Sequence, residues 1–162
     1  MNEVKELLIY LDTEKTTDEK MVCRAAFHGI LRGEPVAPAD LVAATGLPER
    51  TVNDLLVGLN QRGLIEAEPE GGLVVGSWGL SLVPSSHRLH IRNRDLFTWC
   101  ALDAVGIPAG LHEDAFISSS CQHCGLAVYI EMIGGAVAQS EPAEVRLWLT
   151  ACQTGRSVVG FT

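Results

Sequence analysis

Two pairs of side chains in the sequence have the types and spacing for chemistry. Cys100 and Asp103 stand three residues apart in a mostly apolar segment, so on a helix they would share one face. A buried carboxyl group must be paired or protonated, and beside a thiolate it could deliver a proton. Asp103 could equally hold backbone N–H groups or an arginine, and Cys100 alone could be an inert buried thiol. The spacing leaves both alternatives open.

The second pair is Cys121 and Cys124, a CxxC motif with a histidine inside it. Two thiolates at this spacing can chelate one soft metal ion or form a redox pair, and they can also be incidental. A complete structural zinc site needs four ligands, which this motif does not supply alone. The residues that could complete such a site are Cys152, Cys100, His123 and His112.

Composition limits the classes of function. The 162 residues are 47% hydrophobic and 20% charged, as in a globular protein, and carry a net charge of −8. An acidic chain repels nucleic acid, so a nucleic-acid partner is not expected. Neither a signal peptide nor a membrane span is evident, which predicts a cytoplasmic protein with no membrane partner. Five cysteines in such a chain favour reduced thiols over a disulfide framework.

The first half of the chain predicts a helical unit closed by a hairpin. Helices are expected before Gly33, from Pro38 to Gly46, and from Pro48 to Gly63, with strand-like runs at 64–67 and 73–75. Three helices and a wing are typical of a winged helix-turn-helix, here residues 1–76. Acidic residues outnumber basic ones in this unit, which favours a scaffold over a DNA-binding domain.

The second half, residues 77–162, has the pattern of an α+β domain with antiparallel strands. Short alternating apolar runs begin near Leu80, and further strands are expected at 115–117, 126–130 and 145–149. Residues 95–105 are apolar on nearly every side and predict a buried helix, ended by the Gly106–Pro108 segment. The Cys100 and Asp103 pair would lie on that helix.

Four segments of this second half match, in order and spacing, the signatures of a known family. The chain resembles the organomercurial (alkylmercury) lyase family, whose members join an N-terminal winged-helix-like domain to an α+β catalytic domain. The second of these segments is highly specific, because it contains Trp99, Cys100 and Asp103. The segments are Trp78–Arg88, Leu96–Asp103, Ile107–Pro108 and Ser118–Cys121.

The resemblance implies protonolysis of carbon–mercury bonds in the cytoplasm, giving a hydrocarbon and Hg(II) without an organic cofactor. Cys100 would capture the organomercurial R–Hg⁺, because thiolate is the softest side-chain ligand. Asp103 would take a proton, deliver it to the carbon, and help hold the Hg(II) product. Cys121 would be structural, and Cys124 would shape its turn or bind an adventitious metal. External thiols or a mercuric reductase would accept the product.

One departure from the family pattern concerns a second catalytic cysteine near the C-terminus. No cysteine follows Cys152. Either the chain is truncated, or Cys152 substitutes for that cysteine, or the protein lacks lyase turnover. A site with one thiolate should bind R–Hg⁺ but donate less electron density to the carbon. We therefore predict mercury binding with weak or absent cleavage.

Two other functions remain open from the sequence. A metal- or thiol-responsive winged-helix regulator would read DNA with the helical unit and sense its ligand through Cys121, Cys124 and Cys152. A noncatalytic mercury-binding protein would differ from the lyase only in lacking cleavage. A truncated sheet would leave an unpaired edge, which favours a homodimer.

Overall fold

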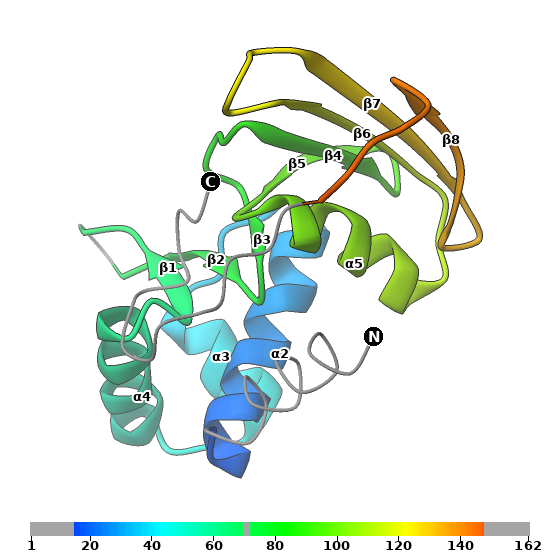
Figure 1. Cartoon of the computed structure of the whole chain (residues 1–162). Coiled ribbons are helices and arrows are strands. Elements are labelled where there is room, and N and C mark those ends of the chain that lie inside the picture. The colour runs from blue at the N-terminus through cyan, green and yellow to red at the C-terminus, as the bar shows by residue number, and fades with distance from the viewer. Residues whose placement is uncertain (1–14, 70–71, 148–162) are drawn as a thin grey trace.

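The computed structural model describes residues 15–69 and 72–147, which form four helices and one eight-stranded sheet (Figure 1). All strand pairs in this part of the chain are antiparallel, so the predicted α+β class is confirmed. The helices are α2 (Thr17–Leu31), α3 (Pro38–Thr45), α4 (Glu49–Gln61) and α5 (Ala101–Leu111). The strands are β1 (Ile65–Ala67), β2 (Val74–Ser77), β3 (Leu80–Ser81), β4 (His87–Ile91), β5 (Arg94–Thr98), β6 (Ala115–Ser120), β7 (Ala127–Ile133) and β8 (Ala136–Glu141).

The three predicted helices of the first half are present as α2, α3 and α4. The α2 helix begins with a capping box, in which Thr16 accepts from the Glu19 N–H and the Glu19 carboxylate accepts from the Thr16 N–H. Glu19 also pairs with Arg62 at the end of α4, which ties the first helix to the third. Gly46 adopts a left-handed conformation that stops α3. The helical unit is therefore held by helix caps and the Glu19–Arg62 ion pair around its apolar core.

The eight strands run in the order β1-β2-β3-β5-β4-β6-β7-β8. The domain boundary predicted near Gly76 and Ser77 falls inside β2, which pairs with β1 on one side and β3 on the other. The sheet thus continues from the hairpin of the helical unit into the second half of the chain. The division into domains at 1–76 and 77–162 stays a prediction.

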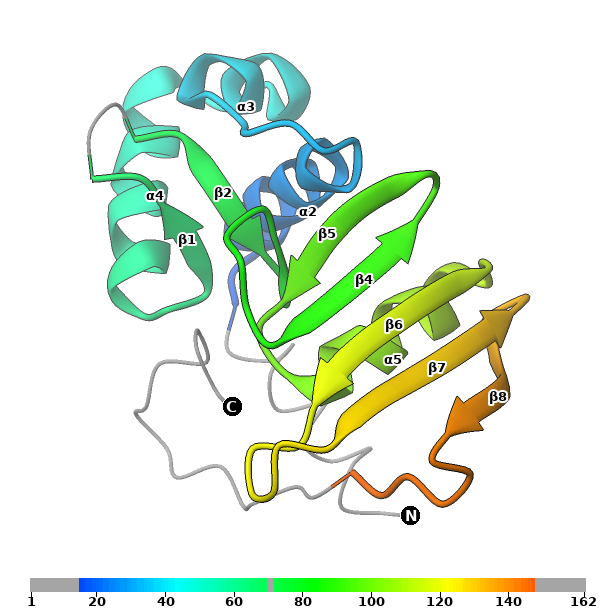
Figure 2. The same ribbon diagram turned by 90° about the horizontal axis from the view of Figure 1, so that it is seen from above.

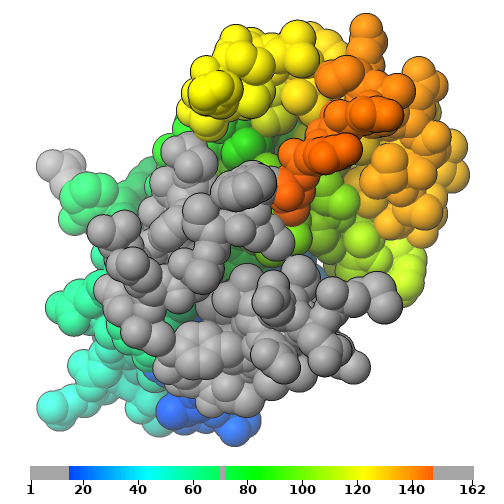
Figure 3. Space-filling model, viewed as in Figure 1, coloured from blue at the N-terminus to red at the C-terminus, as the bar shows by residue number. Residues whose placement is uncertain are grey.

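One face of the central sheet is covered by α5, which contacts β4, β5 and β6 (Figure 2). Side chains on that face alternate with exposed ones along β4, as expected for a sheet with one buried side. At the other end of the sheet, α2 packs on β2 and β3. In the surface view, β7 and β8 form the rim at one end and the helical unit lies at the other (Figure 3). The large buried apolar residues of β4 to β7 are Leu89, Ile91, Leu96, Ile117, Ile130 and Met132.

Both the start and the end of the helix predicted for residues 95–105 were wrong. Residues 94–98 form β5, because Arg92 and Asn93 both adopt positive φ and make the two-residue turn of a β4–β5 hairpin. The helix begins only at Ala101, passes through Gly106 and ends at Leu111. Pro108 is buried within it, where its packing offsets the loss of one backbone hydrogen bond.

The last predicted strand also differs from the structure. Residues 145–147 carry no regular secondary structure, and residues 148–149 lie outside the described part of the chain. The turn at Gly134 and Gly135 instead joins β7 to β8, a mostly exposed strand at the edge of the sheet. An edge strand with no buried face lacks the apolar alternation that identifies a strand in a sequence. No helix in the described residues is long and apolar enough to cross a membrane.

Candidate functional site

The structure brings Cys100 and Asp103 into direct contact at the start of α5. Cys100 has extended backbone angles and is the N-cap residue, and Asp103 stands at the third helical position. Asp103 Oδ2 accepts from the Cys100 N–H at 3.1 Å and from the Cys100 thiol at 3.0 Å. The predicted pairing is present, but it comes from capping geometry rather than from two positions inside a helix.

Burial and mutual charge control the protonation of this thiol–carboxyl pair. Burial, with the Asp103 charge and hydrogen bond, raises the pKa of Cys100 to about 12. Backbone N–H groups of Asp103 and Leu102 donate to the sulfur and partly oppose that rise. Burial also raises the pKa of Asp103, although the two hydrogen bonds from Cys100 oppose it. Burial therefore disfavours the charged form of both groups, and the Cys100 thiol keeps its hydrogen while it donates to Asp103.

A glycine from a distant turn fixes the carboxyl group on its other side. Gly79 lies between β2 and β3 at φ +82°, and a Cβ there would overlap the Asp103 carboxyl carbon and Oδ1. The Gly79 carbonyl also accepts from the Trp99 N–H at 2.9 Å. Only glycine combines this backbone conformation with so close an approach. We had not singled out Gly79 from the sequence, although it follows Trp78 in the first signature segment.

Hydroxyl groups hold the end of β5 that leads into Cys100. Thr98 Oγ1 donates to the Cys100 carbonyl at 3.0 Å, and Ser85 Oγ donates to the Thr98 carbonyl at 2.7 Å. Trp99 is 7% exposed, and its indole N–H has no hydrogen-bond partner among the described residues. The backbone on which the thiol–carboxyl pair sits is thus firmly anchored.

Cys121 and Cys124 lie on the turn that joins β6 to β7, which we call the cysteine turn (residues 121–126). The Cys121 N–H donates to the Leu126 carbonyl, and the Gly125 N–H donates to the Cys121 carbonyl, both at 2.8 Å. Cys121 is half-buried and Cys124 is exposed. The Cys124 N–H, the His123 N–H and the Cys124 thiol all donate to the Cys121 sulfur and lower its pKa.

Of the residues that the sequence offered to complete a metal site, His123 lies within the cysteine turn and His112 lies away from it. His112 caps α5 beside Gly135 of the β7–β8 turn, at the opposite end of β7 from the cysteine turn. Cys152 lies outside the described residues. Within residues 15–69 and 72–147, no three histidine, cysteine or acidic side chains gather as they would around a metal ion. Cys23 is buried in the helical core, and burial raises its pKa to about 11.

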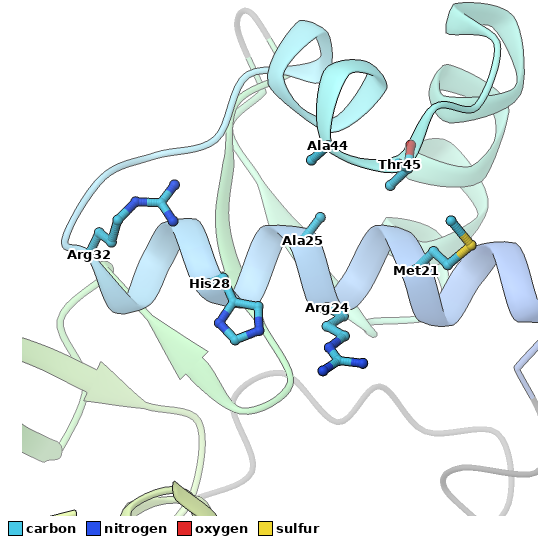
Figure 4. A pocket seen from close by; sticks show the side chains of 7 residues that line it. All are labelled: Met21, Arg24, Ala25, His28, Arg32, Ala44 and Thr45. Atoms are coloured by element: carbon cyan, nitrogen blue, oxygen red, sulfur yellow. The ribbon is translucent and has the colours of Figure 1, made fainter.

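A hollow on the helical unit contains neither cysteine pair. It lies between α2 and α3, where Ala44 and Thr45 face Met21 and Ala25, while Arg24 and His28 extend from the other side of α2 (Figure 4). It therefore offers a thioether and cationic groups but no thiol or carboxylate. The chemistry of the thiol–carboxyl pair is a stronger guide to function than this hollow.

Comparisons with known proteins agree on one family. Residues 80–161 match the family model described as MerB, alkylmercury lyase. The chain is 32% identical over 132 residues to an alkylmercury lyase of Staphylococcus epidermidis, covering 82% of this chain and 59% of that protein. It is 29% identical over 146 residues to an alkylmercury lyase of Bacillus cereus, covering 87% and 65%. The chain thus spans about three fifths of the length of these relatives.

A solved structure extends the likeness to three dimensions. The crystal structure of the mercury-bound form of MerB2 superposes with a TM-score of 0.80 and 28% sequence identity. The match covers 88% of this chain and 68% of that one. It therefore includes much of the helical unit as well as the sheet.

Proposed function

The chain belongs to the alkylmercury lyase family, and on that basis we propose that it captures organomercurial compounds and protonates their carbon–mercury bond. The observation that carries this proposal is the 3.0 Å hydrogen bond from the Cys100 thiol to Asp103 Oδ2. A soft ligand for mercury and a proton carrier are in contact at one buried point. The products would be a hydrocarbon and Hg(II).

The first step is capture of the substrate by Cys100. An organomercurial delivered as R–Hg–SR′ would exchange its thiolate for the Cys100 sulfur, which loses its proton. Asp103 Oδ2 already accepts that thiol hydrogen and has a raised pKa, so it can take the proton as the sulfur–mercury bond forms. The external thiolate R′S⁻ leaves, and the site then holds Cys100–S–Hg–R beside a protonated Asp103.

The second step is transfer of that proton to carbon. Thiolate donation to mercury makes the mercury-bound carbon more basic, and the Asp103 carboxyl group is close enough to protonate it. The carbon–mercury bond breaks, R–H leaves, and the Asp103 carboxylate is regenerated beside the cationic mercury on Cys100. The charge balances, because the new carboxylate faces a new positive centre.

No organic group is needed in either step, so we propose that the protein uses no resident cofactor. An external thiol would bring the substrate and remove Hg(II), and a mercuric reductase is a further acceptor. In the described residues, Cys100 is the one cysteine hydrogen-bonded to a carboxylate. Electron density then reaches the carbon from a single thiolate, and we expect cleavage to be slow relative to capture.

We further propose that the helical unit and the β1–β2 hairpin form a winged-helix-like scaffold, not a DNA reader. Arg50 lies 4.0 Å from Asp54 on α4, and Arg62 pairs with Glu19. These pairs neutralise basic groups that a nucleic-acid-binding helix would present to phosphates. The support for the winged form is the succession of α2, α3, α4 and an antiparallel β1–β2 pair.

The experiment that tests the proposed function follows hydrocarbon and mercury in the same tube. Phenylmercuric acetate would be mixed with the chain and excess glutathione, with benzene measured in the gas phase and mercury measured after removal of small molecules. We expect tight retention and slow benzene release. Cys152→Ser would show whether that thiol contributes, and Cys23→Ala is the control because its thiol lies in the helical core.

Each outcome decides between functions. Release above the glutathione background supports the lyase, whereas retention without release would make the protein a noncatalytic mercury binder. Absence of both would contradict the proposal. Rapid release that Cys152→Ser abolishes would contradict the single-thiolate account of the rate.

A further inference from the structure

The cysteine turn has the geometry of a two-thiol ligand rather than of two unrelated cysteines. Cys121 and Cys124 stand three residues apart in this six-residue turn, so their side chains lie close together. The turn is closed on both sides, by the Cys121 N–H to the Leu126 carbonyl and the Gly125 N–H to the Cys121 carbonyl. Gly125 has a φ of +73°, which lets the chain reverse within this short segment. The two sulfurs are thus held together before any ion binds.

The environment of the turn favours a thiolate that is open to solvent. Three donors interact with the Cys121 sulfur. Two of them are the backbone N–H groups of His123 and Cys124, which are fixed by the fold of the turn. Cys124 is exposed and Cys121 is half-buried, so an ion can reach both. Neither cysteine is paired in a disulfide. Two accessible cysteine sulfurs in one short closed turn are an arrangement that binds a soft metal.

The sheet topology places this turn at the same end of the sheet as Cys100. Strands β5 and β6 both pair antiparallel with β4, which lies between them. Their C-terminal ends therefore lie at the same end of the sheet (Figure 2). Cys100 comes shortly after β5, and Cys121 comes directly after β6. Two strand spacings separate the ends, roughly 10 Å.

We propose that Cys121 and Cys124 form a second site that binds inorganic Hg(II) through both sulfurs. Hg(II) favours two thiolates in a nearly linear arrangement, which a pair of adjacent cysteines supplies. An organomercurial R–Hg⁺ already has one position filled by carbon and takes a single thiolate. The dithiol turn therefore suits the product of cleavage better than its substrate.

The binding step is a ligand exchange without redox change. A mercury bis-thiolate, Hg(SR)₂, would give its ion to Cys121 and Cys124, forming two protein sulfur–mercury bonds. Two external thiols leave and carry away the protons of the two cysteine thiols. Because the turn lies near Cys100, it could accept Hg(II) that is formed at Cys100. That source of the ion rests on the proposed function. Binding itself does not depend on cleavage.

The test uses a chain in which two other cysteines are replaced, Cys100→Ser with Cys152→Ser. Serine is a favoured N-cap residue, so the start of α5 should be preserved. This double variant would be reduced, freed of reductant, loaded with mercuric chloride, and dialysed against glutathione. We expect one mercury per chain to remain, together with the ultraviolet absorption of thiolate-bound Hg(II).

Adding Cys124→Ser should lower the glutathione concentration needed to strip Hg(II) by about tenfold or more, because the second thiolate no longer binds intramolecularly. Adding Gln122→Ala instead is the matched control within the same turn and should leave retention unchanged. Phenylmercuric acetate should be stripped at similar glutathione concentrations with or without Cys124.

Equal retention of Hg(II) with and without Cys124 would overturn the proposal, as would retention that disappears with Cys23→Ala. The test contains no Cys100, so its failure is distinct from failure of the proposed lyase activity. Circular dichroism melting of each variant would confirm that lost retention is not lost folding.

Discussion

The thiol–carboxyl pair and the cysteine turn lie at one end of the same sheet, yet they treat their cysteines in opposite ways. Burial and the Asp103 carboxylate raise the pKa of Cys100 to about 12. Donors from Cys124 and His123 lower the pKa of Cys121, which is open to solvent. A cysteine side chain therefore donates its proton to a carboxylate at the start of α5, whereas on the cysteine turn it is open to a metal ion.

This contrast shows that the position of a cysteine in the fold determines which chemistry its thiol can support. At the start of α5, the Cys100 thiol donates to Asp103, and under the proposed function Asp103 would receive that proton when mercury binds the sulfur. On the β6–β7 turn, no carboxylate among the described residues contacts Cys121, and the interactions of its sulfur are with donors of His123 and Cys124. We therefore assign proton transfer to the buried pair and ion retention to the cysteine turn, as proposed above.

The largest expected effect comes from Cys100→Ser. It removes the capturing sulfur from the buried pair, and release of benzene from phenylmercury should fall to the glutathione background. Serine still caps α5, so the melting temperature should change little. Gas-phase benzene and thermal melting, measured on one preparation, check both expectations. Benzene release at the native rate would contradict the assignment of substrate capture to Cys100.

Gly79→Ala should disturb the thiol–carboxyl pair, although Gly79 itself belongs to a distant turn. An added Cβ would overlap Asp103, and the positive φ strains alanine, so we expect a loss of about 1–3 kcal/mol in stability and reduced benzene release. The control is Gly58→Ala on α4, where nothing lies within 4 Å of the new methyl group. That variant should be up to about 1 kcal/mol more stable with unchanged release. Denaturant unfolding and benzene release distinguish the two variants.

The pH dependence of thiol labelling sharpens the comparison directly. Because the pKa of Cys121 is lowered, iodoacetamide should modify it at a pH below that of an ordinary thiol. Cys100, with its pKa near 12, should stay unmodified through neutral and mildly alkaline pH. Peptide mass spectrometry after timed labelling measures both. Equal labelling rates at neutral pH would remove the distinction between the two environments.

The smallest expected effect is that of Cys124→Ala on the pKa of Cys121. The substitution removes one donor, the Cys124 thiol, but keeps the backbone N–H groups of residues 123 and 124. The pKa should therefore rise slightly and remain below its ordinary value. The labelling profile of Cys121 in this variant gives the shift. A return to ordinary behaviour would mean that the side chain, not the backbone, controls the thiolate.

The sequence predicted the members of both pairs more reliably than the elements that carry them. Cys100 and Asp103 were paired by their three-residue spacing, which holds in a helix interior and in a capping box alike. The bounds of their helix were wrong, because the apolar run at 96–102 continues from a buried strand into the helix without a change in composition. Periodicity alone does not separate these cases.

Two features depend on contacts between distant parts of the chain, and local patterns do not encode them. Gly79 touches Asp103 only because β3 pairs with β5, which brings the β2–β3 turn to the start of α5. The common sheet end of Cys100 and Cys121 follows from the placement of β4 between β5 and β6. The helices of the first half, by contrast, carry local stop signals such as Gly46 and were predicted well.

The most direct test of the account is a single turnover of phenylmercury in D₂O by the native chain and by Asp103→Asn. The variant keeps the shape of the side chain and the Cys100 sulfur but cannot carry the proton. We predict monodeuterated benzene from the native chain, and from Asp103→Asn retained phenylmercury with release slower by about a hundredfold or more. Equal benzene release from both chains would contradict proton delivery by Asp103.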